Sequence, residues 1–414
     1  MARIEKVLIG QSGGPTAVIN ASLAGAVRSA RALGAPVLGM AHGIEGLLHD
    51  EVVDLDVAVP DDRSLDVLRS TPGSYLGSCR YKLPSPEEAP AVYDALLGTL
   101  DRLGVGVVAY IGGNDSMDTI DKLGRYGEAA GSAIRFMGVP KTIDNDLVAQ
   151  DHTPGYGSAA KFVATCVSEL ACDASVYPVK SVLVVETMGR DVGWLGAASS
   201  LAWTAGSRGP DIVLVPEAPV SLDAFLDKVS NLLAVQDFVM VAVSEGARGL
   251  DGQPLYAEEG AREDAFGHAA SQAGVGGFLA RLVSERLGCK ARGVELSTLQ
   301  RCAAHVVSGR DREEAEALGA LAVRVGLEGR SRGMSCLARV SDLPYEVRLG
   351  VTDVSAVANE VRQLPGSWIA NDGMGVTAEF ERYARPLVEG TDTCRWVDGV
   401  PWHLRAPFGE TVAL

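Results

Sequence analysis

The fold class is decided by the stretch Ile134-Arg135-Phe136-Met137-Gly138-Val139-Pro140-Lys141-Thr142-Ile143-Asp144-Asn145-Asp146. Its first residues, 134–137, form a short apolar run without strict alternation, which is typical of a parallel strand buried on both faces. Its last residues, 140–146, are mostly polar or charged. Ligands of open parallel sheets bind beyond the carboxyl ends of the strands, so the polar string predicts a site there.

Polar residues follow four further apolar runs in the same way. The runs span residues 7–9, 107–111, 182–185 and 238–243, and the segments after them are Gly10-Gln11-Ser12-Gly13-Gly14, Gly112-Gly113-Asn114-Asp115-Ser116, Thr187-Met188-Gly189-Arg190 and Ser244-Glu245-Gly246. Another run spans 212–215, and helical patterns span 20–33, 159–170 and 277–287. This alternation predicts an α/β doubly wound architecture. Five strand ends of this kind predict one shared cleft.

The composition bounds the number of domains and the class of partner. A chain of 414 residues is too long for one small core, so two lobes are expected. The net charge is −16 and no basic stripe is present, which argues against nucleic-acid binding. No apolar run reaches the roughly 18 residues of a bilayer span, and the N-terminal apolar segment is too short for a signal peptide. We expect a cytoplasmic protein without a membrane segment, and its seven cysteines to be reduced.

Two glycine-containing strand ends are candidates for binding phosphate and metal. In residues 10–14, glycines allow close backbone approach, and N–H groups at a helix start attract anions. A purely structural turn explains these glycines equally well. In the next such segment, Asn114 and Asp115 offer oxygen ligands suited to Mg²⁺, with a helix-capping turn as the alternative.

The polar string has the residue types that phosphoryl transfer to an alcohol requires. Such a transfer needs a base for the hydroxyl proton, a metal ion that bridges phosphate oxygens and a cation for developing charge. Asp144, Asp146 and Lys141 could supply the three. A solvated turn rich in Asx residues is the alternative.

Two other groups of residues have a less specific pattern. Arg190 follows a strand end, and Arg292 and Arg301 flank polar residues; guanidinium groups bind phosphate bidentately, while surface ion pairs are the alternative. Gly274-Val275-Gly276-Gly277 precedes a helix without a buried strand before it, so we interpret it as helix packing and not as a dinucleotide site. Residues 249–264 are expected to form a surface loop.

Taken together and in order, these segments resemble the phosphofructokinase family. Its motifs appear here as Ser12-Gly13-Gly14, Leu76-Gly77-Ser78-Cys79-Arg80, Gly112-Gly113-Asn114-Asp115, Pro140 to Asp146, Met188-Gly189-Arg190, Glu245, and Arg292 with Gln300-Arg301. The resemblance spans about residues 5–310, and the Thr-Ile-Asp-Asn-Asp string and the ordered set are highly specific. It implies two Rossmann-like doubly wound lobes with the active site in the cleft between them.

The resemblance also implies how the chain is organised. Residues 1–155 and about 274–320 would form a donor-binding lobe, residues 156–273 a lobe that binds the sugar phosphate, and residues 321–414 a C-terminal extension packing on the lobes. Subunits of the family share sites, and some substrate-binding Arg residues arrive from a neighbour. A homodimer or homotetramer is therefore implied.

Residue roles follow from the same resemblance. Asp144 is similar to the family's proton acceptor on the sugar 1-hydroxyl, and Thr142 would contact the substrate and the transferring phosphoryl group. The positions that match the fructose 6-phosphate site are Thr142, Asp144, Met188, Gly189, Arg190, Glu245, Arg292, Thr298, Gln300 and Arg301. Gly14 and Arg80 match the donor side, and Asn114 and Asp146 match positions associated with Mg²⁺, the cofactor implied.

Two positions bear on the choice of phosphoryl donor. ATP-using bacterial members resemble Gly-Gly-Asp-Gly-Ser and carry a small residue before the Thr of the string, where this chain has Asp115 and Lys141. A carboxylate at position 115 would fill the space of the ATP α-phosphate and repel its charge. Lys141 would stabilise the leaving group when pyrophosphate reacts. Asn114 departs from the family's Asp, and an amide oxygen is a weaker magnesium ligand.

We therefore expect an enzyme that reversibly transfers a phosphoryl group from pyrophosphate to the 1-hydroxyl of fructose 6-phosphate with Mg²⁺, as in glycolysis. An ATP-dependent phosphofructokinase and a sedoheptulose 7-phosphate kinase are the enzymatic alternatives. A silent regulatory subunit is the alternative outside enzymes, and it would be expected to lose Asp144 or the arginines.

Overall fold

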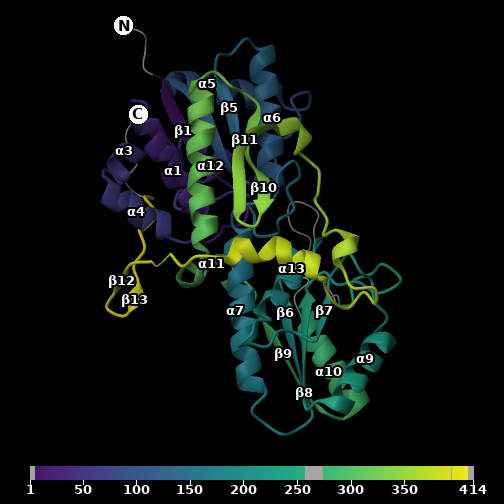
Figure 1. The fold of residues 1–414 in the computed structure, drawn as a ribbon. Coiled ribbons are helices and arrows are strands. Elements are labelled where there is room, and N and C mark those ends of the chain that lie inside the picture. Colours follow the sequence, from purple (N-terminus) through teal and green to yellow (C-terminus); the bar gives the residue numbers. More distant parts are fainter. Residues whose placement is uncertain (1–4, 257–273, 393, 409–414) are drawn as a thin grey trace. The chain divides into compact units, whose positions relative to one another are not determined.

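The computed structural model describes residues 5–256, 274–392 and 394–408 of the chain (Figure 1). The chain divides into two compact units: unit 1 comprises Met1–Ser158, Arg301–Val361 and Gly390–Leu414, and unit 2 comprises Ala159–Gln300 and Arg362–Glu389. Within the described residues, no helix combines the length and the apolar character needed to cross a lipid bilayer. The seven cysteines are free thiols.

Unit 1 is built on a seven-stranded, mostly parallel sheet with the order β11-β10-β5-β4-β1-β2-β3. Its strands are β1 (Lys6–Gln11), β2 (Val37–Met40), β3 (Val52–Asp54), β4 (Val105–Gly112), β5 (Arg135–Pro140), β10 (Gly333–Asp342) and β11 (Tyr345–Asp353). The four central strands and β10 are parallel, and the edge strands β3 and β11 run antiparallel to their neighbours. The apolar runs expected to form strands here do so.

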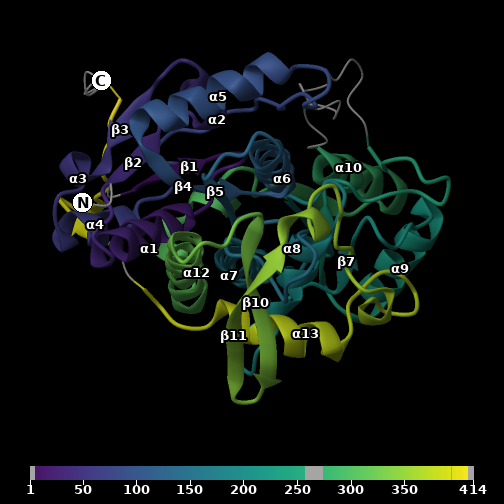
Figure 2. The same cartoon turned by 90° about the horizontal axis from the view of Figure 1, so that it is seen from above.

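Helices cover both faces of this sheet because successive side chains of a strand point to opposite faces. Val7 and Ile9 of β1 share a core with α1, α4 and α12, whereas Leu8 shares a core with α2, α5 and α6. Figure 2 shows these two layers on either side of the sheet. The helices of unit 1 are α1 (Ile19–Ala32), α2 (Gly43–Leu48), α3 (Leu55–Ala58), α4 (Asp62–Ser70), α5 (Pro90–Leu103), α6 (Asn114–Ala129), α12 (Gly309–Leu327) and the short turns η2 (Ala304–Val306) and η3 (Val354–Ala356), with a small hairpin of β12 (Trp396–Val397) and β13 (Val400–Pro401).

Unit 2 has a four-stranded parallel sheet with the order β7-β8-β6-β9. Its strands are β6 (Ser181–Thr187), β7 (Ile212–Leu214), β8 (Phe238–Ser244) and β9 (Lys290–Glu295), and its helices are α8 (Trp194–Ala198), η1 (Ser199–Ala202), α9 (Leu222–Val235), α10 (Val275–Leu287), η4 (Gly366–Trp368), α13 (Ala378–Ala384) and η5 (Arg385–Val388). α9 and α10 share a core with the sheet through Phe225, Val229 and Leu279. α8 also packs on the sheet, and its buried Trp194 lies against Phe380 of α13. Two elements span the unit boundaries, α7 (Tyr156–Ala174) and α11 (Leu299–Cys302).

The structure confirms the doubly wound class but moves the predicted limits of the lobes. β9 pairs in parallel with β6, so residues 274–300 belong to unit 2 and not to the donor lobe. Of residues 321–414, which are predicted to pack on the lobes as an extension, β10 and β11 enlarge the sheet of unit 1 and residues 362–389 belong to unit 2. Of the expected surface loop, residues 257–264 lie outside the described residues.

Candidate active site

Three polar strand ends of unit 1 meet at one edge of its sheet. β1, β4 and β5 are parallel neighbours, and Gly112 at the end of β4 pairs with Pro140 at the end of β5. The glycine turn that ends with residue 14, the start of α6 and the polar string follow these ends directly. The ends of β6 and β8 form a second group in unit 2. A cleft shared by both groups stays a prediction.

Lys141 is the buried cation of the unit 1 group. It is 2% exposed, its backbone N–H donates to Gly112 O at 3.0 Å, and its Nζ donates to Gly14 O at 2.7 Å. Burial lowers the pKa of Lys141 to about 8, against the opposing effect of the Asp144 and Asp146 carboxylates. An ammonium group has three N–H donors, so two remain after the bond to Gly14. Lys141 thus joins the glycine turn to the polar string and can still bind an anion.

Thr142 and Asp146 form a hydrogen-bonded pair next to this cation. The Thr142 hydroxyl donates to the Asp146 carboxylate and accepts the N–H of Asp144 at 3.1 Å. Burial, and then the charge of Asp144, raise the pKa of Asp146 to about 7. Oδ1 of Asp146 is buried and has no hydrogen-bond partner among the described residues. Burying a carboxylate oxygen without a partner costs free energy unless the oxygen binds a proton or a cation.

The polar string is held by the segment that follows it in the chain. Asn145 is fully buried with a φ of 55°, and its Oδ1 accepts the N–H of Thr153 at 3.0 Å. The N–H of Thr142 donates to Pro154 O at 3.2 Å, and Thr142 forms an isolated bridge with Gly155. The alternative interpretation of the string as a solvated turn is therefore wrong, because its backbone and its central side chain are buried in these contacts.

The side chain of Asn114 forms hydrogen bonds with a segment of unit 1 that is distant in the sequence. Its amide nitrogen donates to Glu360 O, and its Oδ1 accepts the N–H of Asn359 at 2.6 Å. A carbonyl oxygen has a second lone pair, so a role of Asn114 at Mg²⁺ stays a prediction. Neither Asn359 nor Glu360 belongs to a motif, and no signal in the sequence points to this contact.

Further charged residues surround the glycine turn. Asp115 is exposed in the first turn of α6, where the helix dipole stabilises a carboxylate. Arg80 is exposed in a segment tied to the turn by the Ser78 hydroxyl, which donates to a carbonyl of the turn at 2.7 Å. A methyl group placed on Gly14 would lie 3.4 Å from Nη1 of Arg301. Arg301 therefore lies with the residues expected to bind the donor, and its assignment to the sugar phosphate stays a prediction.

The predicted sugar-phosphate residues of unit 2 cluster where β6 and β8 end. Met188, Gly189 and Arg190 follow β6, and Glu245 follows β8. The backbone N–H of Glu245 donates to Thr187 O at 2.9 Å, which joins the two strand ends. Burial raises the pKa of Glu245, opposed by the charge of Arg190 and a hydrogen bond from Gly189. Nε of Arg190 is buried without a hydrogen-bond partner in the described part of the chain, so this donor suits an anionic ligand.

The remaining predicted residues of unit 2 lie on or after β9. Gln300 is buried, and its Oε1 accepts the N–H of Met188 at 3.3 Å. Thr298 is exposed two residues before it. Arg292 is exposed on the edge strand β9, where it pairs with Leu183 in the middle of β6. Gln300 thus joins the group at the strand ends, whereas the backbone of Arg292 lies three residues before the end of its strand.

The glycine segment at residues 274–277 binds a carboxylate of the protein itself. Gly274 N–H donates to both carboxylate oxygens of Glu186, at 3.0 and 3.1 Å, and Gly276 N–H donates to Oε2 at 2.8 Å. Buried Glu186 therefore occupies the anion position at the start of α10. A methyl group on Gly293 would lie 2.8 Å from the backbone nitrogen of Gly277. These contacts confirm the interpretation of this segment as helix packing.

Few protein ligands are available to a metal ion at this site. Within the described ranges, no three His, Cys, Asp or Glu side chains gather into a metal-binding cluster. Mg²⁺ usually takes one or two carboxylates and completes its shell with water and substrate phosphates. The buried, unpaired Oδ1 of Asp146, close to Asp144, fits an ion held in that way.

Comparisons with known proteins agree with this geometry. Residues 6–325 match the family model described as Phosphofructokinase. The pyrophosphate–fructose 6-phosphate 1-phosphotransferase of Xanthomonas campestris pv. campestris (strain B100) is 40% identical over 398 residues, which cover 95% of this chain and 94% of that protein. The protein of the same name from Methylococcus capsulatus is 38% identical, with 94% and 93% covered. The crystal structure of the pyrophosphate-dependent phosphofructokinase from Marinobacter aquaeolei matches with a TM-score of 0.88 at 33% identity, over 99% of this chain and 98% of that chain.

Proposed function

Because the chain belongs to the phosphofructokinase family, we propose that it reversibly transfers a phosphoryl group from pyrophosphate to the 1-hydroxyl of fructose 6-phosphate. The products are fructose 1,6-bisphosphate and phosphate, a step of glycolysis. The relatives named for this reaction align over nearly their whole length. The single observation that carries the proposal is Lys141, a buried cation bound to the glycine turn and facing two carboxylates.

Asp144 is the general base in this proposal. It takes the proton of the 1-hydroxyl while that oxygen forms a bond to the phosphorus of the donor. Thr142 accepts the backbone N–H of Asp144 and thereby restrains the backbone that carries the carboxylate. The hydroxyl of Thr142 also contacts the transferring phosphoryl group in this proposal. These two residues therefore position the acceptor and the transferring group against each other.

Lys141 acts on the leaving group. As the bond between the bridging oxygen and the transferred phosphorus breaks, negative charge develops on the phosphate that departs. The two remaining N–H donors of Lys141 can bind that phosphate, and a preformed cation in a water-poor site stabilises the charge strongly. Gly14 and Arg80 complete the donor side of the site, and Arg301, which is expected to bind the sugar phosphate, lies beside Gly14.

Asp146 would hold Mg²⁺, with Asn114 as a further oxygen ligand. A divalent cation held there would supply positive charge to the phosphates of the donor. The raised pKa of Asp146 reflects a carboxylate that lacks solvation, so a divalent cation would replace the missing donors.

Asp115 selects the donor. Its carboxylate is exposed in the first turn of α6, at the strand end next to the glycine turn. A donor larger than pyrophosphate must place a further phosphate and a nucleoside in that region, where it meets a like charge. Pyrophosphate ends before this position and avoids the repulsion.

The residues of unit 2 bind the sugar phosphate. Arg190 offers a buried, unpaired Nε to the anion, and Met188, Gly189, Glu245, Thr298 and Gln300 line the same strand ends. Arg292 lies on an exposed edge strand, which suits a contribution to the site of a neighbouring copy. A homodimer or homotetramer is therefore part of the proposal.

A panel of donors and acceptors tests this function. Purified protein is assayed with fructose 6-phosphate and Mg²⁺, with pyrophosphate or ATP as the donor, and then with sedoheptulose 7-phosphate as the acceptor. Turnover with pyrophosphate and fructose 6-phosphate well above the other pairs is expected. A preference for ATP or for the seven-carbon sugar would replace the proposal by that enzymatic alternative, and the absence of turnover with all pairs would indicate a silent subunit.

A further inference from the structure

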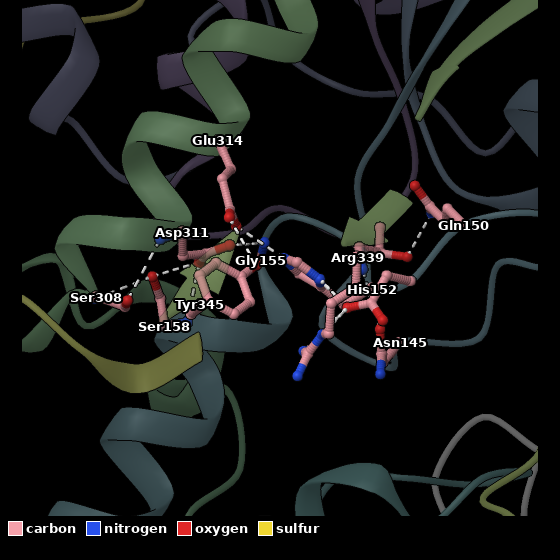
Figure 3. A network of polar contacts seen from close by, with 12 residues as sticks. Asn145, Gln150, His152, Gly155, Ser158, Ser308, Asp311, Glu314, Arg339 and Tyr345 are labelled. Carbon is pink, nitrogen blue, oxygen red and sulfur yellow. Dashed lines mark hydrogen bonds and ion pairs between the residues drawn. The ribbon is translucent and has the colours of Figure 1, made fainter. Parts of the chain in front are cut away.

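The N-terminal half of α12 carries two buried carboxylates that lie outside the site described above. Asp311 is 1% exposed and Glu314 is 7% exposed. They are three residues apart and therefore lie on one face of the helix. Figure 3 shows both side chains pointing toward the loop that carries His152 and Gly155. A buried carboxylate without hydrogen-bond or charge partners is rare in proteins. The contacts of each of these two carboxylates therefore identify the segment that it holds.

Asp311 anchors the end of this loop where α7 begins. Its Oδ1 accepts the N–H of Gly155 at 2.9 Å, and its Oδ2 accepts the N–H of Ser158 at 2.9 Å together with the Ser158 hydroxyl. Ser158 Oγ in turn accepts the N–H of Ser308 at 3.3 Å. Both carboxylate oxygens thus accept hydrogen bonds from residues at the start of α7, Gly155 just before the helix and Ser158 in its first turn, in the manner of a helix cap supplied by another helix.

Glu314 anchors the beginning of the loop through His152. The ring nitrogens of His152 lie 2.7 Å from Glu314 Oε2 and 2.7 Å from Asp151 Oδ2. The Tyr345 hydroxyl donates to the other oxygen of Glu314 at 2.8 Å, and Arg339 Nε donates to Asp151 at 3.1 Å. One imidazolium and one guanidinium therefore balance two carboxylates in a buried cluster, which makes every member dependent on the others.

The residues between the two anchors hold the catalytic string. Thr153 N–H donates to Asn145 Oδ1, and Pro154 O accepts the N–H of Thr142. Thr142 and Asn145 flank Asp144 on both sides. Gly155 has a φ of 110°, and a methyl group there would lie 2.9 Å from Thr142 O, so only glycine allows this approach.

α12 is itself fixed firmly enough to act as a reference for the loop. A methyl group on Gly319 would lie 2.0 Å from Ser22 O of α1, and one on Gly25 of α1 would lie 2.0 Å from Glu316 O of α12. Backbones in such close contact leave neither helix room to shift. The positions of the two carboxylates are therefore set by the core of unit 1.

We propose that Asp311 and Glu314 are positioning residues, which clamp residues 151–158 onto α12 and thereby aim Thr142 and Asp144 at the transferring phosphoryl group. The inference rests on the proposed function, in which those two residues act. Both carboxylates work through the loop and touch neither substrate. Their loss therefore lowers kcat and leaves the KM values of pyrophosphate and fructose 6-phosphate nearly unchanged.

Asp311→Asn is the main test because it changes no volume. The amide offers one acceptor oxygen, and its NH₂ group meets backbone N–H donors of Gly155 or Ser158. A misplacement of about 1 Å can cost on the order of 10²-fold in rate, so we expect kcat to fall by about 10- to 100-fold. Ser158→Ala removes one of the three donors and should give a smaller loss in the same direction, which keeps the test open should Asp311→Asn fold poorly.

Glu314 provides a rescue test. Glu314→Gln can accept from His152 and donate to the Tyr345 oxygen, so both contacts survive, and kcat should stay within about threefold of wild type. Glu314→Ala loses both contacts and should lower kcat as Asp311→Asn does. A role in stability alone would lower the melting temperature of both variants without separating their kcat values.

Asp211→Asn is the matched control. Asp211 is a carboxylate of unit 2 that accepts the N–H of Met240 at 2.8 Å before the start of β7, at the edge of the sheet away from the strand ends of the site. The Asp211→Asn substitution should lower the melting temperature of the protein and leave kcat unchanged. The inference is overturned if Asp311→Asn keeps wild-type kcat, if it raises a KM without lowering kcat, or if Asp211→Asn loses as much kcat. An inactive wild-type enzyme would instead refute the proposed function.

Discussion

Replacing Lys141 by Met removes the buried cation and keeps the length of the side chain. Nζ donates to Gly14 O at 2.7 Å, and its two other N–H groups are available to the departing phosphate. A hydrogen bond to a charged group contributes about 1.5–3 kcal/mol, which corresponds to a factor of about 10–150 in rate when the bond forms only in the transition state. Loss of one preformed donor to a developing oxyanion typically costs on the order of 10²–10³ in kcat.

We therefore expect Lys141→Met to lower kcat with pyrophosphate by roughly 10²-fold. The KM of fructose 6-phosphate should change little, because the residues proposed to bind that substrate lie mainly in unit 2. The assay is steady-state kinetics with pyrophosphate varied at saturating fructose 6-phosphate, and the reverse. A parallel fall of kcat and kcat/KM for pyrophosphate identifies an interaction made in the transition state.

Lys122→Met is the matched control for this substitution. Lys122 Nζ also donates to a backbone carbonyl, Leu83 O at 3.0 Å, and it pairs with Asp118 at 2.6 Å on α6. Its loss removes the same chemical group from unit 1 without touching the strand ends. The account of Lys141 fails if its variant keeps more than about half of the wild-type kcat, or if the Lys122 variant loses as much.

Three further outcomes are expected. Asp144→Asn should lower kcat by about 10²–10⁴-fold at unchanged melting temperature, as removal of a general base does, and near-normal turnover would contradict that role. Asp115→Asn, which removes charge only, should raise kcat/KM for ATP, and Asp115→Gly should raise it further by opening space; unchanged ATP use in both variants would place donor selection elsewhere. Hydrogen bonds and charges of Asp151 and Glu314 outweigh burial and raise the pKa of His152 to about 9, so its stabilisation is complete below the unfolded value near 6.5 and is lost as the pH rises through 9. In urea unfolding, the stability difference between wild type and His152→Gln should shrink by about 3 kcal/mol between about pH 6 and pH 10, and a pH-independent difference would refute a charged His152.

The strand ends of the site could be found from sequence because two simple patterns coincide there. An apolar run of four to six residues marks a buried parallel strand, and a ligand site requires glycine, hydroxyl or charged residues just after it. Residues 107–116 and 134–146 follow this rule closely, and the structure has them as β4, β5 and the segments after them. Such local signals depend only on neighbours in the chain.

The supporting residues could not be found in that way. Asp311 and Glu314 stand in the sequence Gly-Arg-Asp-Arg-Glu-Glu at the start of a helix, a pattern that is typical of a solvated helix face. They are buried because α12 packs against residues that are distant in the chain, among them His152, Gly155 and Tyr345. The same holds for residues 274–300, whose place in unit 2 depends on the pairing of β9 with β6 and not on any feature of the segment itself.

The charges at the unit 1 strand ends depend on one another, which explains why the string that carries them is held so tightly. Burial alone would favour neutral Lys141, and the carboxylates of Asp144 and Asp146 keep its pKa from falling further. The charge of Asp144 in turn raises the pKa of Asp146, and that of Lys141 opposes the rise. Each of these effects changes with distance, since a Coulomb interaction in a poorly solvated site weakens as its charges separate. In a protein of net charge −16, whose long-range field repels phosphates, binding relies on this short-range arrangement. A shift of the polar string would therefore change the electrostatic surroundings of Asp144, Lys141 and Asp146 together. The contacts that fix residues 151–158 on α12 prevent that shift.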